Sequence, residues 1–295
     1  MKYLVFEAGG RAGLSAELFF VNRLRRDDGN SLVLADLDAT YRRCPCPAGV
    51  SRVGEEEALA LIGGNASDCA VFPADELARQ SKPAVSALAA RDPFVAVEPW
   101  FYNKRRMNER LALVTDGCRI RIPDTFSLED VFMRPNTMSA GCRGVGALEN
   151  ICITQRVEIA HEYVIDVNWT ADEPVIYARE VRIKNGYDKY LQFLGKQSRI
   201  ALAVDEFVHA VRRSVPKLVT GIFHIQLIEN PDGEIFFVEY SKRISGTAIV
   251  NLFRGYNPFD ALAGSETPVY KGDCAKENVW YRYEDFIMNL SKIRP

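Results

Sequence analysis

Residues 221–243, GIFHIQLIENPDGEIFFVEYSKR, are the most strongly patterned stretch of the chain, and they predict an antiparallel β-hairpin. Two apolar runs, at 221–227 and 234–240, flank a polar segment that contains the turn sequence NPDG at 230–233. Proline and glycine at these positions suit a reversal of chain direction. The hairpin therefore predicts an antiparallel sheet in the second half of the chain.

Polar residues recur with a period of two in this hairpin. If residues 230–233 form a four-residue turn, Gln226 lies opposite Phe237, and alternation places Gln226, Glu239 and Ser241 on one face, with His224 close to Glu239. A carboxylate in an apolar strand is costly unless it is paired or bound to a metal. Amide, carboxylate and hydroxyl oxygens suit Mg²⁺ bound to nucleotide phosphates. The alternative is a carboxylate that only pairs with a neighbouring basic side chain.

A second polar motif lies upstream of the hairpin. A predicted strand ends at Arg134, and a glycine-rich loop that contains Ser139, Gly141 and Arg143 follows it. Guanidinium groups bind phosphate oxygens in a forked geometry, and the backbone N–H groups of such a loop can close over phosphates. The alternative is an ordinary β-hairpin with an exposed glycine turn.

The first part of the chain alternates strands and helices. Strands at 3–6, 31–35 and 69–73 and a helix at 14–26 predict a parallel sheet. The turn GGRAG at 9–13 precedes the helix, where backbone N–H groups favour anions. Its spacing is not GxGxxG, so glycines that allow close packing explain the turn at least as well as a dinucleotide site.

The second half contains further predicted elements. We expect helices at 104–114 and 198–213 and strands at 151–157 and 162–169. Polar residues between the last strand and the second of these helices are interpreted as the surface of another helix, with substrate contacts as the alternative. These residues are Lys189, Tyr190 and Lys196.

Composition narrows the class of protein. The 295 residues carry a formal charge of −2 with both signs interspersed, so the sequence predicts no nucleic-acid partner. No apolar run approaches the roughly 20 residues that span a bilayer, so no membrane partner is expected. The seven cysteines are irregularly spaced, and the first apolar run is too short for a signal peptide. These features predict a cytoplasmic protein with reduced thiols.

Taken in order, the motifs resemble the ATP-grasp superfamily, especially small ligases akin to the large chain of carbamoyl-phosphate synthetase and to carboxylate–amine ligases. The resemblance spans most of the chain. Its motifs are DCAVFPADE at 68–76, NK at 103–104, IPDT at 122–125, RP at 134–135 with the glycine-rich loop, ITQRV at 153–157, EYVIDV at 162–167, GIFHIQ at 221–226 and EYSKRISGT at 239–247. It implies an α/β chain with the ATP-grasp fold. Residues 1–98 would form an N-terminal parallel α/β lobe, residues 99–157 a small lid, and residues 158–295 an antiparallel α+β core.

The resemblance also implies ligands for ATP. Phosphate contacts, an adenine-binding hinge and a ribose-binding carboxylate are expected. In that order these are Lys104 and Arg134, then Gln155, Arg156 and Val157, then Glu162. Arg134 stands where many relatives have lysine.

The same resemblance assigns the metal and the reacting groups. Gln226 and Glu239 would hold Mg²⁺, with Ser241 as a hydroxyl ligand where the family usually has asparagine. Arg243 would steady the transferred phosphate or the acyl phosphate, and Arg182 would reach the γ-phosphate.

The implied activity is that of an ATP- and Mg²⁺-dependent ligase. A small-molecule carboxylate would be activated as an acyl phosphate and attacked by an amine, or by a thiol, with release of ADP and phosphate. Because the family often forms dimers, a homodimer is one expected state. Two alternatives remain: a catalytically degenerate nucleotide-binding sensor or scaffold, and an oxidoreductase that binds NAD at the N-terminal glycine turn.

Overall fold

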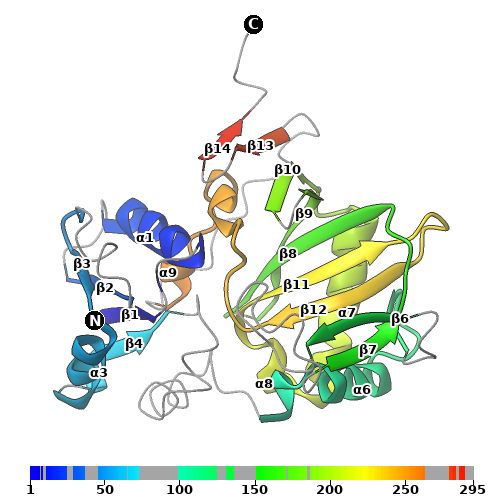
Figure 1. The fold of residues 1–295 in the computed structure, drawn as a ribbon, viewed down its shortest axis with the longest axis horizontal. Coiled ribbons are helices and arrows are strands. Elements are labelled where there is room, and N and C mark those ends of the chain that lie inside the picture. Colours follow the sequence, from blue (N-terminus) through cyan, green and yellow to red (C-terminus); the bar gives the residue numbers. More distant parts are fainter. Residues whose placement is uncertain are drawn as a thin grey trace, which may run out of the picture.

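The fold was analysed in a computed structural model (Figure 1). The structure describes residues 1–6, 8, 11–24, 29–36, 46–64, 66–72, 99–124, 131–135, 151–170, 172–184, 187–262, 279–283 and 286–289. Within these residues the strands form a four-stranded sheet, an eight-stranded sheet and a separate two-stranded sheet. In Figure 1 the small blue and cyan sheet lies to one side of the large green and yellow sheet, and an orange segment runs between them.

The small sheet is parallel and has the strand order β3-β2-β1-β4. Its strands are β1 (Lys2–Phe6), β2 (Ser31–Ala35), β3 (Val50–Val53) and β4 (Cys69–Val71). Helices α1 (Arg11–Leu24) and α3 (Glu55–Gly64) cover it. Tyr3 and Val5 pack with residues of α1, whereas Leu4 and Phe6 pack with residues of α3. Both faces are thus buried, as a continuous apolar strand requires in a parallel sheet.

The large sheet has the order β14-β13-β10-β9-β8-β11-β12-β5 and is antiparallel except between β12 and β5. In chain order its strands are β5 (Ile120–Arg121), β8 (His161–Trp169), β9 (Val175–Lys184), β10 (Tyr187–Phe193), β11 (Gly221–Glu229), β12 (Ile235–Ser241), β13 (Val279–Tyr283) and β14 (Phe286–Asn289).

Two helices pack on one face of this sheet, namely α6 (Lys104–Val114) and α7 (Arg199–Ser214). Helix α7 begins where the Ser198 side chain accepts a hydrogen bond from the N–H of Ala201 at 3.2 Å. Its apolar stripe includes Phe207, which is fully buried and stacks on Phe237 of β12. Helix α6 begins with the same kind of cap at Asn103. The opposite face of the sheet carries polar side chains together with buried apolar ones, such as Val164, Tyr177 and Ile222.

The remaining elements connect these layers. The two-stranded sheet pairs β6 (Val131–Pro135) with β7 (Ile151–Gln155). Short helices complete the described chain: η1 (Ala66–Asp68), η2 (Pro99–Tyr102), α8 (Pro216–Val219), η5 (Ala248–Arg254) and α9 (Pro258–Leu262). Among the described residues, no helix is both long and apolar enough to cross a membrane.

The observed elements confirm the mixed α/β class, the parallel N-terminal sheet, the hairpin at 221–243 and the helices at 104–114 and 198–213. One interpretation is wrong, because Lys189 and Tyr190 lie in strand β10 and not on a helix. This strand is held by its pairing with β9, an interaction that local periodicity does not encode. The predicted lobe boundaries at 98/99 and 157/158 stay predictions.

Candidate active site

The pairing of β11 and β12 brings the predicted metal ligands together. Gln226 lies opposite Glu239, and His224 lies opposite Ser241. The predicted pairing of Gln226 with Phe237 is wrong, because a β-bulge shifts the register there and Leu227 pairs with Phe237 instead. Between the pairs Gln226–Glu239 and Leu227–Phe237, β12 contains one residue more than β11. Because of it, Phe237 lies in the core beneath α7 although Glu239, two residues later, lies on the other face and pairs with Gln226.

Alternation then divides each strand between the two faces of the sheet. The core beneath α7 contains Ile165 of β8, Ile225 of β11 and Tyr240 of β12. Side chains of the intervening positions occupy the other face, and they include the polar ones: Glu162, Asp166, Asn168, His224, Gln226, Glu239 and Ser241. The sheet therefore separates an apolar face that packs on helices from a face where these polar side chains gather, called the polar face below, although buried apolar residues such as Val164 and Ile222 lie there too.

Lys104, the first residue of α6, reaches this polar face. Its Nζ lies 3.4 Å from Oε2 of Glu239, and the two side chains are only 11% and 18% exposed. Burial by itself would raise the pKa of Glu239, but the ammonium of Lys104 and the guanidinium of Arg243 outweigh it and lower this pKa below the usual value. Glu239 is therefore an anion beside two cations, so the carboxylate can bind a metal while the cations can bind phosphate oxygens.

The donors around Glu239 fit a magnesium ion that is bound together with nucleotide phosphates. The Ser241 hydroxyl is fully buried, and within the described part of the chain it has no hydrogen-bond partner. Together with the amide oxygen of Gln226 it would complement the single carboxylate of Glu239. Mg²⁺ commonly takes one or two carboxylates and completes its shell with phosphate oxygens and water. No cluster of three or more His, Cys, Asp or Glu placed to hold a metal occurs among the described residues.

His224 holds the segment that follows β12. Its Nδ1 lies 3.0 Å from the carbonyl oxygen of Arg243, which can only accept, so Nδ1 carries the proton and donates. Burial and the nearby guanidinium of Arg243 lower the pKa of His224 to about 4, against the opposing effect of Asp166. The imidazole is therefore neutral at pH 7. Arg243 is half-buried, and its Nη1 donates to the carbonyl of Ile244 at 3.0 Å.

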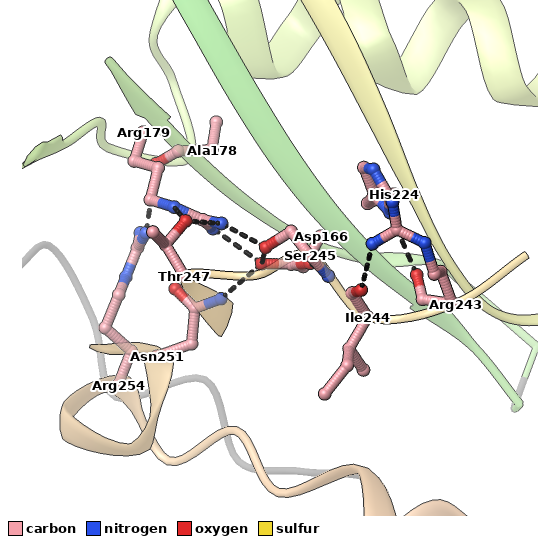
Figure 2. Close-up of polar contacts among 10 residues, drawn as sticks. All are labelled: Asp166, Ala178, Arg179, His224, Arg243, Ile244, Ser245, Thr247, Asn251 and Arg254. Carbon is pink, nitrogen blue, oxygen red and sulfur yellow. Dashed lines mark hydrogen bonds and ion pairs between the residues drawn. The ribbon is translucent and has the colours of Figure 1, made fainter. Parts of the chain in front are cut away.

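A fully buried ion pair lies beside this segment (Figure 2). Nη1 of Arg179 is 2.5 Å from Oδ2 of Asp166, and neither side chain is exposed. Burial by itself would raise the pKa of Asp166, but the charge of Arg179 and the hydrogen bond from the Ser245 N–H help to lower it. Asn251 also donates to Asp166, at 2.9 Å.

The predicted nucleotide ligands lie along one end of the sheet. Glu162 lies near the start of β8 and is half-buried, whereas Arg156 is exposed and Val157 half-buried in the link from β7 to β8. The N–H of Gln155 donates to the carbonyl of Asp124 at 2.7 Å, so the hinge is tied to the segment that leaves β5.

Several predicted residues lie outside what the structure describes. Ser139, Gly141 and Arg143 are outside the described residues. The backbone of Arg134 lies in β6 and that of Arg182 in β9, and the side chains of both are outside the described atoms. The roles assigned to all five stay predictions.

The Asp166 cluster is a feature that the sequence motifs do not predict. Asp166 lies within the strand motif EYVIDV at 162–167, and Arg179 lies in none of the motifs. A signal was present, because each charged residue interrupts an apolar run, in VIDV and in VIYAREV. Such interruptions imply paired charges, but the partner depends on the register between β8 and β9.

Comparison with known proteins finds the same fold in solved structures. No family model matches the sequence, and no curated protein sequence matches it. Solved structures do match. The N5-carboxyaminoimidazole synthetase of Staphylococcus aureus, solved with ADP, is similar with a TM-score of 0.62 and 13% identity, over 90% of this chain and 78% of that chain.

Two further structures are similar over most of their length. The carboxyaminoimidazole ribonucleotide synthase of Aspergillus clavatus, solved with ATP, gives a TM-score of 0.64 at 15% identity, over 95% of this chain and 81% of that chain. The L-amino acid ligase of Bacillus licheniformis gives a TM-score of 0.60 at 14% identity, over 95% of this chain and 78% of that chain. These are ligases with the architecture that the sequence motifs predicted, and the likeness at this identity is one of fold. The chain therefore has the ATP-grasp fold.

Proposed function

We propose that this chain is an ATP- and Mg²⁺-dependent ligase that activates a small carboxylate as an acyl phosphate for attack by an amine. The observation that carries the proposal is the position of Lys104 beside Glu239, on a polar sheet face that also presents Gln226 and Ser241. This arrangement combines a cation for phosphate oxygens with oxygen donors for a hard metal. The similar structures solved with ADP or ATP support it.

The proposed reaction depends mainly on positive charge near the phosphates and on the alignment of the reactants. Phosphoryl transfer is accelerated by cations that offset negative charge on the transferred group and by alignment of the two reactants. Lys104 and Arg243 would supply these cations, because both lie close enough to Glu239 to lower its pKa. A carboxylate oxygen of the substrate would attack the γ-phosphorus, and ADP would leave. An amine would then attack the acyl carbon, lose a proton and displace phosphate.

Mg²⁺ would be held by Glu239, Gln226 and Ser241 and would supply further positive charge to the phosphate oxygens. Its neutralising effect adds to that of the two protein cations. With only one carboxylate among these three ligands, we propose that the site depends on nucleotide to bind the metal tightly.

Glu162 and residues 155–157 would hold the ribose and the adenine, and the segment from Arg134 through Arg143 would cover the phosphates. A covered site would exclude water from the acyl phosphate and so protect it from hydrolysis.

The test is ADP release from ATP and Mg²⁺ in the presence of pooled amino acids and small carboxylates. Release that depends on one carboxylate and increases with an amine supports the ligase. Tight ATP binding in calorimetry with no release from any pool would favour a nucleotide-binding sensor. Absence of ATP binding would contradict the proposed site.

A further inference from the structure

The cluster around Asp166 joins three parts of the chain beside the candidate site. Asp166 lies on β8 and Arg179 on β9, and both side chains are fully buried. A buried ion pair contributes little net stability, because desolvation of two charges opposes their attraction. Such a pair can instead determine the conformation of a neighbouring segment, when its hydrogen bonds favour one arrangement of that segment.

The neighbouring segment here is the loop at 243–247, which follows β12. The Ser245 N–H donates to Oδ1 of Asp166 at 3.0 Å, and its hydroxyl donates to Oδ2 at 3.1 Å. Arg179 donates from Nη2 to the Ser245 hydroxyl, and from Nε and Nη2 to Oγ1 of Thr247 at 3.2 and 2.8 Å. All three nitrogens of this guanidinium are therefore engaged by the pair and the loop.

The loop is also held just before the cluster. His224 on β11 donates to the carbonyl of Arg243, as Figure 2 shows. Residues 243 and 245 are thus bonded to the polar sheet face from two different strands. The Arg243 side chain branches from the Cα directly before the first of these points, so its position depends on the backbone that the two bonds hold in place.

The cluster continues into η5. Asn251 donates to Asp166, and Arg254 donates to the carbonyls of Ala178 and Leu194 at 3.2 and 2.9 Å. These bonds hold the far end of the loop against β9 and the residue after β10.

We propose that Asp166 and Arg179 are positioning residues that hold the loop at 243–247 and thereby place Arg243 beside Glu239 for phosphoryl transfer. The inference rests on the proposed function for its catalytic meaning, whereas the holding of the loop is independent of it. Both side chains are fully buried, so neither would contact the substrate.

The test uses Asp166→Asn, which keeps the shape of the side chain but turns an amide N–H₂ or a neutral oxygen toward Arg179. Hydrogen exchange of peptides that span 242–251 is measured in the full chain, together with calorimetric binding of ATP and Mg²⁺ and ADP release from the pooled carboxylates. Val208→Ala is the matched control, because Val208 is fully buried in α7 and packs in the core on the other face of the sheet.

We expect exchange in 242–251 to rise about ten-fold over the control, as local opening of the loop becomes easier. ADP release should fall about ten-fold or more while the Kd for ATP changes by less than about three-fold, since a mispositioned Arg243 affects transfer more than binding. The double variant Asp166→Asn with Arg179→Gln should show no faster exchange and no slower ADP release than Asp166→Asn alone, because both members of the pair act together.

Exchange that rises no more than in Val208→Ala would overturn the inference, and so would faster exchange with unchanged ADP release. If the unmodified chain neither binds ATP nor releases ADP, the proposed function fails. Exchange alone then decides whether the pair holds the loop.

Discussion

Lys104 Nζ lies 3.4 Å from Glu239 Oε2, although 135 residues separate the two in the chain. Lys104 begins a helix that packs on one face of the sheet, and Glu239 lies near the end of β12, the second strand from the edge, on the other face. A lysine that is only 8% exposed and beside a carboxylate can neutralise that carboxylate or a phosphate oxygen. When nucleotide and metal bind, Lys104 would therefore pair with a phosphate oxygen and Glu239 with the metal, in place of their present contact with each other.

Lys104→Met should weaken ATP binding. Loss of a charge-assisted hydrogen bond costs about 1.5–3 kcal/mol, which corresponds to a Kd higher by about 10- to 100-fold. Calorimetry with ATP and with adenosine separates the phosphate contact from the base contact, because only ATP binding should weaken. Arg105→Met is the matched control, since Arg105 is exposed on the same helix and pairs with Glu109. Equal weakening for adenosine would contradict the phosphate role.

Glu239→Gln should abolish most Mg²⁺-dependent turnover. We expect ADP release to fall by about 100-fold or more, the scale seen when one group that stabilises developing charge is removed. Glu234→Gln in the same hairpin is the control, because Glu234 pairs with the exposed Arg121 at the hairpin end. Turnover that survives in Glu239→Gln would place the metal elsewhere.

Ser241→Ala should separate metal binding from stability. The buried hydroxyl carries a desolvation cost that no hydrogen bond offsets in the described structure, so its removal should leave the free energy of unfolding unchanged or higher. The Mg²⁺ concentration for half-maximal ADP release should nevertheless rise. A loss of stability of about 1 kcal/mol or more with no change in the Mg²⁺ requirement would show a structural hydroxyl.

His224 should make stability sensitive to mild acid. Its pKa falls from 6.5 to about 4 on folding, so between these values the unfolded chain binds the proton and the folded chain does not. Stability is then lost as the pH falls from about 6.5 toward 4, by about 3 kcal/mol in all. Urea unfolding between pH 5 and 7.5 should show this slope, and His224→Gln should flatten it.

Two carboxylates beside His224 affect stability at a lower pH than His224 does. Asp166 and Glu239 have lowered pKa values in the fold, so their contribution is present above the ordinary values of 3.8 and 4.5 and is lost as the pH falls below them. The slope above pH 5 therefore reports on the imidazole. An unchanged slope in His224→Gln would contradict its assignment as a buried neutral group.

Phe207→Ala tests the core beneath the polar face. Phe207 is fully buried and stacks on Phe237 with ring centres 5.9 Å apart, so its truncation should lower the free energy of unfolding by about 3–5 kcal/mol. Leu202→Ala on the same helix, at a side chain 38% exposed, should cost less than about 1 kcal/mol. Urea denaturation followed by circular dichroism measures both.

Much of the fold could be predicted because its signals are local. The helix at 199–214 follows from its apolar period and its capping Ser198, and the hairpin follows from NPDG between apolar runs. The parallel sheet follows from alternating strands and helices. The strand at 187–193 lacked such a signal, because its polar sequence is held in place by the neighbouring strand.

The site was less predictable because it depends on register. The chemistry of Gln226, Glu239 and Ser241 was visible in the sequence, but the bulge that sets Gln226 against Glu239 leaves no local mark. Asp166 and Ser245 are 79 residues apart, and no periodic pattern links them. Long-range pairs of this kind emerge only when strands and loop are placed together.

The orange segment between the sheets in Figure 1 has a consequence for how the protein is made. Phe259 of α9 stacks on Phe72 and packs edge-on against Tyr3 and Phe20, so the core of the N-terminal sheet is completed by late residues. A ribosome that adds about 5–20 residues per second needs roughly 10–40 s to pass from Phe72 to Phe259. Throughout that interval the nascent chain exposes the aromatic surface that Phe259 later covers, and such transiently exposed apolar surface favours aggregation.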